Sequence, residues 1–258
     1  MSSTTGRRVV WNTPSVTANG LKNFACIVML LQNIGIVVIE KGIIHLEQYT
    51  QESLSQAMAA DSNLMMVSGI ASVLQLIGGM AIPIFAFLLV EGFLNTSSYK
   101  KYLLSIFIFA LLSEIPYDLA MSQRVFDFSS QSAMVSMLIS LLMLYVLKMI
   151  KQIQGLPGVF LQILTVLGGI LWVTFLRTEY GLCIILLAAI FYLLYARNGW
   201  KTLLGVLVSL MYVTGPLSFY GIWCYNGERK DKFSKYIYYV FYPVHLLLLA
   251  LIAKAVGA

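Results

Sequence analysis

Repeated apolar runs of about 20 residues constrain the fold of this chain more than any other sequence feature. A helix needs about 20 mostly apolar residues to cross the roughly 30 Å hydrocarbon core of a membrane. Such runs recur along nearly the whole sequence, which is 59% hydrophobic and only 11% charged. Soluble domains carry about 25% charged residues. The sequence therefore predicts an all-α, polytopic integral membrane helical bundle.

We expect about eight transmembrane segments in one membrane domain, 21–258, preceded by a cytoplasmic N-terminal segment, 1–20. The expected segments are 21–39, 67–94, 101–119, 132–150, 158–176, 181–197, 202–224 and 236–256. Pro83 and Pro216 fall inside two of them, and proline bends a helix because it lacks a backbone N–H donor. The polar connection 45–66 is expected to form a surface loop or a short amphipathic helix.

Lysine and arginine placement orients the predicted helices, because short cytoplasmic loops are enriched in these residues. Arg7 and Arg8 place the N-terminus inside, as expected for a multi-pass protein of the bacterial cytoplasmic membrane. A full crossing by 202–224 would then leave the basic segment 229–235 outside. Because a turn back near Pro216 returns that segment to the cytoplasm, we expect a broken or re-entrant segment there.

Several function classes lack their sequence signatures. No Walker sequence, GxGxxG turn, GxSxG elbow or HExxH pair occurs, which argues against ATPases, Rossmann enzymes, serine hydrolases and zincins. The formal charge of +6 comes from basic residues scattered over short loops, so we expect no nucleic-acid partner. With two histidines, and three cysteines without CxxC spacing, we expect no metal site. Membrane transferases and transporters remain.

Two carboxylates lie inside the third predicted segment. A charge in a membrane span costs about 3 kcal/mol on insertion scales, so it indicates a functional site. Glu114 and Asp118 are four positions apart and share one helix face, with Pro116 between them. They either repel and share a proton or cation, or lie at the interface and orient the following loop. Glu91, at the end of the second segment, has a similar pair of interpretations.

His245 follows Tyr242-Pro243 and begins a leucine-rich run in the last predicted segment. A histidine in this position serves either as a general base or as a structural, hydrogen-bonded interfacial residue. The sequence alone leaves both interpretations open.

Short blocks spread over nearly the whole chain resemble, in the same order, the TraX family of bacterial membrane proteins. The blocks are GLK at 20–22, MLLQNIG at 29–35, AIPIFAFLLVEGF at 81–93, YLL at 102–104, ALLSEIPYD at 110–118, YNGER at 225–229 and YPVHL at 242–246.

The resemblance implies acyl transfer, because the family's namesake acetylates the N-terminus of conjugative pilin and the family is similar to membrane acyltransferases that use cytoplasmic acyl-CoA. The acceptor would be an amine or hydroxyl of a peptide or envelope component, reached within membrane lipid. His245 would be the general base, oriented by Glu114 or Asp118. Candidate substrate contacts are Glu91, Gln32, Asn33, Gln131, Arg177 and Glu179, and candidate contacts to the CoA phosphates are Arg229, Lys230 and Lys232.

The chain departs from the family pattern at four places. Gln32-Asn33 stands where the family has an Asp-His pair, and an amide does not accept a proton at neutral pH. The other three departures are Gly79 for an Arg, Ser132 for an Asn and Glu179 for an Asp. Three alternatives remain open: an acyltransferase that relies on His245, a non-catalytic binding or interaction protein, and a small-solute transporter coupled through Glu114 and Asp118.

Overall fold

The computed structural model describes residues 14–228 and 235–257, and this part of the chain is all-helical, with isolated bridges but no strand. The elements are α1 (Ala18–Asn33), η1 (Ile34–Ile44), η2 (Leu46–Gln48), α2 (Gln51–Ala60), α3 (Ser62–Gly78), α4 (Ala81–Leu94), α5 (Tyr99–Met121), α6 (Ala133–Ile150), α7 (Leu156–Phe175), α8 (Gly181–Leu193), α9 (Asn198–Ser209), η3 (Gly215–Leu217), α10 (Ser218–Trp223) and α11 (Lys235–Val256).

Six helical segments in the described ranges are long and apolar enough to cross a membrane, and the expected count of eight is not confirmed. The six are Ala18–Ile44, Ser62–Leu94, Tyr99–Met121, Ala133–Ile150, Leu156–Phe175 and Tyr236–Val256. The sixth segment expected from the sequence corresponds to α8, which has only 13 residues. The seventh corresponds to α9, η3 and α10, which are all short.

The stretch from α9 to α10 is a helical hairpin rather than a crossing. The indole Nε1 of Trp223, at the end of α10, donates to Thr202 Oγ1 near the start of α9 at 3.1 Å. Pro216 lies in the first turn of η3, where the chain reverses. The turn is held by Thr214, whose hydroxyl donates to the Leu76 carbonyl of α3. The segment expected to be broken near Pro216 is therefore broken and reverses there.

Gly78 and Gly79 explain the break between α3 and α4. Glycine lowers helix stability by about 1 kcal/mol relative to alanine, so a Gly-Gly pair is a natural interruption. Pro83 lies in the first turn of α4, where backbone N–H groups have no partner within the helix, so the N–H that proline lacks costs no hydrogen bond. The bend expected at Pro83 thus occurs a few residues earlier.

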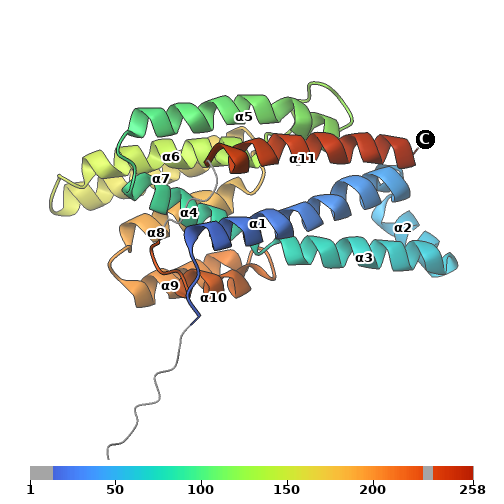
Figure 1. Ribbon diagram of the computed structural model, residues 1–258, viewed down its shortest axis with the longest axis horizontal. Coiled ribbons are helices and arrows are strands. Elements are labelled where there is room, and N and C mark those ends of the chain that lie inside the picture. Colours follow the sequence, from blue (N-terminus) through green and yellow to red (C-terminus); the bar gives the residue numbers. More distant parts are fainter. Residues whose placement is uncertain (1–13, 229–234, 258) are drawn as a thin grey trace, which may run out of the picture.

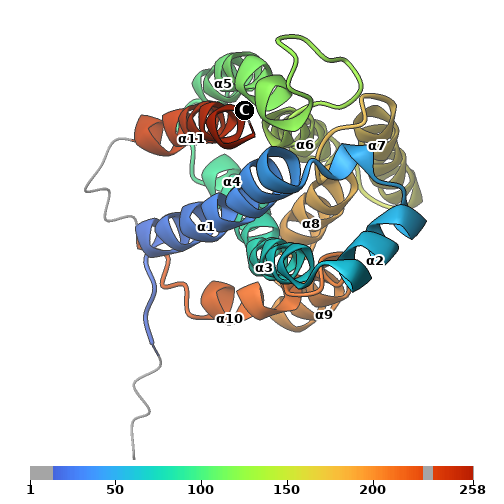
Figure 2. The same ribbon diagram turned by 90° about the vertical axis from the view of Figure 1, so that its right-hand side faces the viewer.

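α4 and α8 form the centre of the bundle. Figure 2, which looks along the helices, shows them surrounded by α1, α3, α5, α6, α7, α9 and α11. α8 packs against α4, α6, α7 and α9, and its Ile185, Leu187 and Ala188 are fully buried. α1 and its π-helical continuation η1 extend along α3 and α11 on one side (Figure 1).

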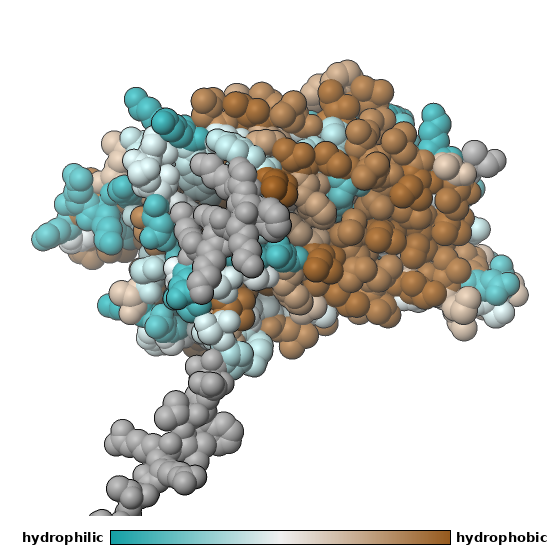
Figure 3. Space-filling view, viewed as in Figure 1, coloured by the Kyte–Doolittle hydropathy of each residue, from teal (hydrophilic) through white to brown (hydrophobic). Residues whose placement is uncertain are grey.

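Basic residues gather at one end of the bundle, here named the basic end and defined by Lys100, Lys101, Lys148, Lys151, Arg197 and Lys201. The Lys148 ammonium lies 5.7 Å from the ring centre of Phe93, and that of Lys201 lies 5.4 Å from the ring centre of Tyr195. Figure 3 shows hydrophilic residues at this end, on the left, and hydrophobic residues over the middle and right of the same face. α2 lies at the opposite end (Figure 1).

The hairpin predicts that both of its ends open on one side of the membrane. In a Cys224→Ser background, an impermeant maleimide should label Asn198→Cys and Glu228→Cys from the same side, and Ser55→Cys in α2 from the other. Residues 55, 198 and 228 are all exposed, whereas Cys26 and Cys183 are buried and will not react. Labelling of positions 198 and 228 from opposite sides of sealed vesicles would contradict the hairpin.

Candidate functional site

A cavity of about 210 Å³ lies inside the bundle between α1, α4, α5, α6, α8 and α11. Its outer end is lined by Lys22, Thr96 and Tyr238, which lie at the helix termini of the basic end. Lys22 and Gln32, which both line it, are ten positions apart on α1, so the cavity extends roughly 15 Å along that helix at about 1.5 Å per residue.

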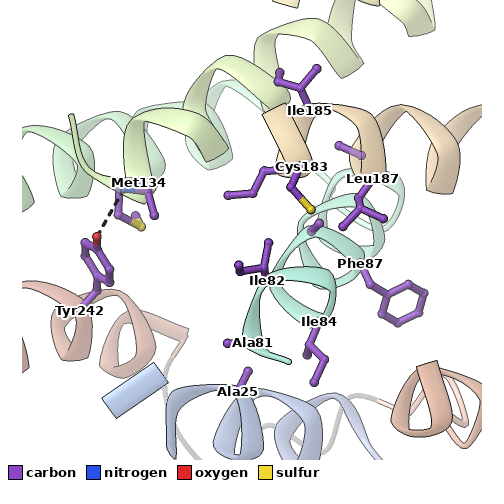
Figure 4. Close-up of a cluster of buried hydrophobic side chains, with 14 of the residues drawn as sticks. Ala25, Ala81, Ile82, Ile84, Phe87, Met134, Cys183, Ile185, Leu187 and Tyr242 are labelled. Carbon is purple, nitrogen blue, oxygen red and sulfur yellow. Dashed lines mark hydrogen bonds between the residues drawn. The ribbon is translucent and has the colours of Figure 1, made fainter. Parts of the chain in front are cut away.

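The wall between the two ends of the cavity is apolar. It consists of side chains from α1, α4, α5, α6 and α8, namely Met29, Ala81, Ile82, Phe85, Leu88, Leu89, Ile106, Met134, Met137 and Ile184. Figure 4 shows Ala81 of α4 next to Ala25 of α1, and Met134 of α6 beside Tyr242 of α11. Methionines fill irregular space and adapt to a ligand's shape, so this wall suits a flexible, mostly apolar ligand.

The inner end of the cavity is polar and hydrogen-bonded. It is lined by Gln32, Asn33, Glu179, Tyr180 and Tyr242. Gln32 Nε2 donates to the Tyr180 hydroxyl at 2.8 Å, and that hydroxyl is bonded to the Glu179 carboxylate. The Tyr242 hydroxyl donates to Glu179 Oε2 over a long 3.5 Å and accepts from the Ala133 N–H at 3.3 Å (Figure 4). Glu179 is thus held between two tyrosine hydroxyls.

The turn between α7 and α8 carries Glu179 and Tyr180 into the bundle. The Glu179 N–H donates to the Gln131 carbonyl at 2.8 Å, and the Gln131 N–H donates to the Arg177 carbonyl at 3.3 Å. Arg177 and Tyr180 adopt left-handed backbone conformations, with φ of 49° and 54°, which reverse the chain tightly. Gln131 and Arg177 therefore act through their backbones to fix the turn.

The carboxyl group of Glu179 lies in this turn, outside the spanning helices. Removal from bulk water raises its pKa to about 7, the tyrosine hydrogen bonds oppose that rise, and the charge of Glu114 adds to it. Glu179 is only half-buried because part of its surface faces the cavity. A carboxyl with such a pKa exchanges a proton near neutral pH.

His245 lies behind the cavity wall rather than on it. Its Nδ1 is 2.8 Å from the Phe241 carbonyl, so Nδ1 carries the proton and donates. Nε2 is then the acceptor, and it receives a hydrogen bond from Asn33 Nδ2 at 2.7 Å. The imidazole is 4% exposed and stacks on the Phe241 ring, with the centroids 4.9 Å apart. Both ring nitrogens are occupied, and a ligand in the cavity meets Asn33 first.

Glu114 and Asp118 attach α5 to the connection 122–132. Glu114 Oε1 accepts from the Ser132 hydroxyl at 2.6 Å and from its N–H at 3.2 Å, while Oε2 is buried without a partner. Asp118 Oδ2 accepts from the Asp127 N–H at 2.9 Å. Neither carboxylate is hydrogen-bonded to His245, so no direct contact supports the orienting role that was predicted for them.

Of the remaining predicted site residues, the structure describes only Glu91, which lies away from the inner end. Glu91 is buried near the end of α4, where its Oε2 accepts from Asn95 Nδ2 at 3.2 Å. Arg229, Lys230 and Lys232 lie outside the described residues.

The structure thus brings Gln32, Asn33 and Glu179 together on the cavity and adds two residues that sequence reasoning missed, Tyr180 and Tyr242. A signal for Tyr242 was available, because residues three apart on a helix share a face and His245 follows it by three. In the described part of the chain, no three His, Cys, Asp or Glu residues lie close enough to hold a metal ion.

Comparison with known proteins gives one match. The model of the family described as TraX protein matches residues 17–253, which is nearly the whole chain and includes every element that lines the cavity. No curated protein and no solved structure matches the chain. On the strength of the family match, this multi-pass membrane protein belongs to the TraX family.

Proposed function

We propose that this protein is a membrane acyltransferase that moves an acyl group, such as acetyl, from acyl-CoA to an amine or hydroxyl of a peptide or envelope component. The observation that supports the proposal is the cavity, which leads from the basic end past an apolar wall to the half-buried carboxylate of Glu179. Acyl transfer needs a pocket that holds a thioester away from water and places a proton acceptor beside the attacking group.

The two ends of an acyl-CoA suit the two ends of this cavity. The nucleotide end of the donor carries phosphates, which the positive charge around Lys22 at the outer end would attract. The acyl and pantetheine parts are extended and mostly uncharged, which suits the apolar wall. Glu228, whose carbonyl accepts from the Ala18 N–H at 3.2 Å, brings the chain to the start of α1 just before Arg229, Lys230 and Lys232. We propose that these residues also contact the donor phosphates.

The proposed orientation follows from the donor. Acyl-CoA is a cytoplasmic metabolite, so the basic end and the N-terminus would face the cytoplasm of a bacterial cell. The acceptor would reach the inner end from the membrane or from the opposite side.

Incubation of the purified protein in nanodiscs with labelled acetyl-CoA and membrane extract tests the function. We expect time-dependent transfer of label to an extract component, and none with empty nanodiscs. Binding of acetyl-CoA is measured in parallel by equilibrium dialysis. Binding without transfer to any extract component would contradict catalysis.

A second candidate function is a non-catalytic TraX-like binding protein, and one observation favours it. The hydrogen bond from Asn33 occupies the only lone pair that the His245 ring has available. Gln32 and Asn33 also stand at the positions of the family's Asp-His pair, in which each side chain could exchange a proton. In this case acetyl-CoA or a peptide binds in the cavity without turnover, and the transfer experiment separates the two candidates.

A further inference from the structure

We infer that Glu179, rather than His245, is the general base of the proposed acyl transfer, and that His245 is a positioning residue which acts through Asn33. This inference rests on the proposed function and specifies the chemistry of the same cavity. It differs from the prediction made from the sequence, which placed His245 in contact with the substrate.

Glu179 has the access that a base requires. Among the described residues that line the cavity it carries the only carboxylate, and no histidine lines the cavity. A base must come within hydrogen-bond reach of the proton that it removes, either directly or through one water. Glu179 meets this condition for any acceptor whose amine or hydroxyl reaches the inner end.

The two tyrosines hold the Glu179 carboxylate in place. Tyr242 donates to Oε2, and Tyr180, itself fixed by Gln32 at 2.8 Å, also bonds to the carboxylate. A carboxylate that keeps hydrogen-bond donors while it faces a water-poor cavity remains available as a proton acceptor near neutral pH.

The reaction balances with the groups present in the cavity and the two substrates. Glu179 accepts the proton of the acceptor amine or hydroxyl as its nitrogen or oxygen attacks the thioester carbonyl carbon. The new C–N or C–O bond forms, the C–S bond breaks, and the electron pair leaves with sulfur. Glu179 then returns its proton to the CoA thiolate. The products are the acylated acceptor and free CoA thiol, with no net proton gained or lost.

His245 instead fixes how Asn33 faces the cavity. Its Nε2 accepts from Asn33 Nδ2, so the amide nitrogen points toward the imidazole and the carbonyl oxygen is the group left for a ligand. That oxygen can accept a hydrogen bond from the attacking amine or hydroxyl and orient it toward Glu179. Loss of the imidazole would free the amide to rotate without removing the base.

The inference predicts how the rate depends on pH. The transfer rate should rise with pH through about 7, because a base works only when deprotonated and burial raises the pKa of Glu179 to about 7. The titratable groups that interact with Glu179 in the described residues are Glu114 and Tyr117 of α5, Tyr180 beside it, Tyr212 after α9 and Tyr242 of α11. None is a cation, so no neighbour lowers this pKa by charge.

The test compares Glu179→Gln and His245→Gln in nanodiscs, with Glu52→Gln on the exposed helix α2 as the control. For Glu179→Gln we expect kcat to fall by roughly 10²- to 10⁴-fold, with acetyl-CoA binding within a few-fold of wild type and a residual rate independent of pH. For His245→Gln we expect a loss of roughly tenfold, with the rise near pH 7 preserved. Glu179→Asp keeps a carboxylate and should retain that rise, and acetyl-CoA binding reports whether each variant is folded.

Two results would overturn the inference while leaving acyl transfer in place. One is a Glu179→Gln variant that transfers label at the wild-type rate. The other is a His245→Gln variant whose transfer rate no longer depends on pH, while the pH dependence of Glu179→Asp stays the same as that of wild type. Absence of transfer by the wild-type protein would instead contradict the proposed function, and with it the inference.

Discussion

Met137→Trp should abolish binding of acetyl-CoA, with an apparent Kd at least 100-fold weaker than wild type and no detectable transfer. Met137 lies on α6, is half-buried, and lines the apolar wall between Lys22 at the outer end and Gln32 at the inner end. An indole is larger and stiffer than a thioether chain, and the cavity measures only about 210 Å³. A tryptophan that extends into this space leaves no room for an extended donor. Equilibrium dialysis with labelled acetyl-CoA measures the loss.

Leu171→Trp is the matched control for this prediction. Leu171 is 70% exposed on α7, so a larger side chain there meets no other part of the protein core. We expect binding and transfer to stay close to wild type in this variant. If Met137→Trp, shown to be folded by its thermal transition, binds acetyl-CoA as tightly as Leu171→Trp does, the donor occupies another site.

Hydropathy was enough to predict the helical class and the position of most helices, because a helix that crosses the hydrocarbon core of a membrane must be both long and apolar. The expected count of eight spans was not confirmed, for a physical reason. α8 is apolar on all sides, a pattern that fits either a helix surrounded by lipid or one surrounded by protein. The structure places it at the centre of the bundle, packed against four helices, where a short helix needs no contact with lipid.

Charge placement carried information that hydropathy lacked. The window 202–224 is apolar enough to suggest a crossing, and only the basic residues that follow it indicated a turn back. The bond between Trp223 and Thr202 confirms the turn. In this region the distribution of lysine and arginine predicted the reversal of the chain better than hydropathy did.

The candidate site was only partly predictable from the sequence. A charge in an apolar segment is conspicuous, and that rule identified Glu114, Asp118 and His245. Their contacts in the structure are to a loop and to Asn33, and none of them lines the cavity. Tyrosine is common at membrane interfaces and carries little signal by itself, so Tyr180 was missed, and Tyr242 could have been found only through its helical spacing to His245. Which polar groups meet depends on helix packing, which one sequence does not specify.

Gly78→Ala should destabilise the folded protein severely, by about 1–3 kcal/mol or more, because the position has no room for a methyl group. A Cβ built on Gly78, at the end of α3, overlaps the Cβ and the amide of Gln32 on α1. The Gln32 Cβ is attached to the backbone and cannot rotate away, so the two helices must separate. Their separation would also break the bond from Gln32 to Tyr180, so acetyl transfer should fall together with stability.

Gly69→Ala on the same helix provides the control for this close approach. A Cβ there meets nothing within 4 Å, and alanine is a better helix former than glycine by about 1 kcal/mol. We therefore expect Gly69→Ala to melt at or above the wild-type temperature and Gly78→Ala to melt well below it, when unfolding in nanodiscs is followed by tryptophan fluorescence. Equal melting temperatures for the two variants would mean that α1 and α3 are not in contact at Gln32. The inner end of the cavity would then lack the support that holds Tyr180 against Glu179.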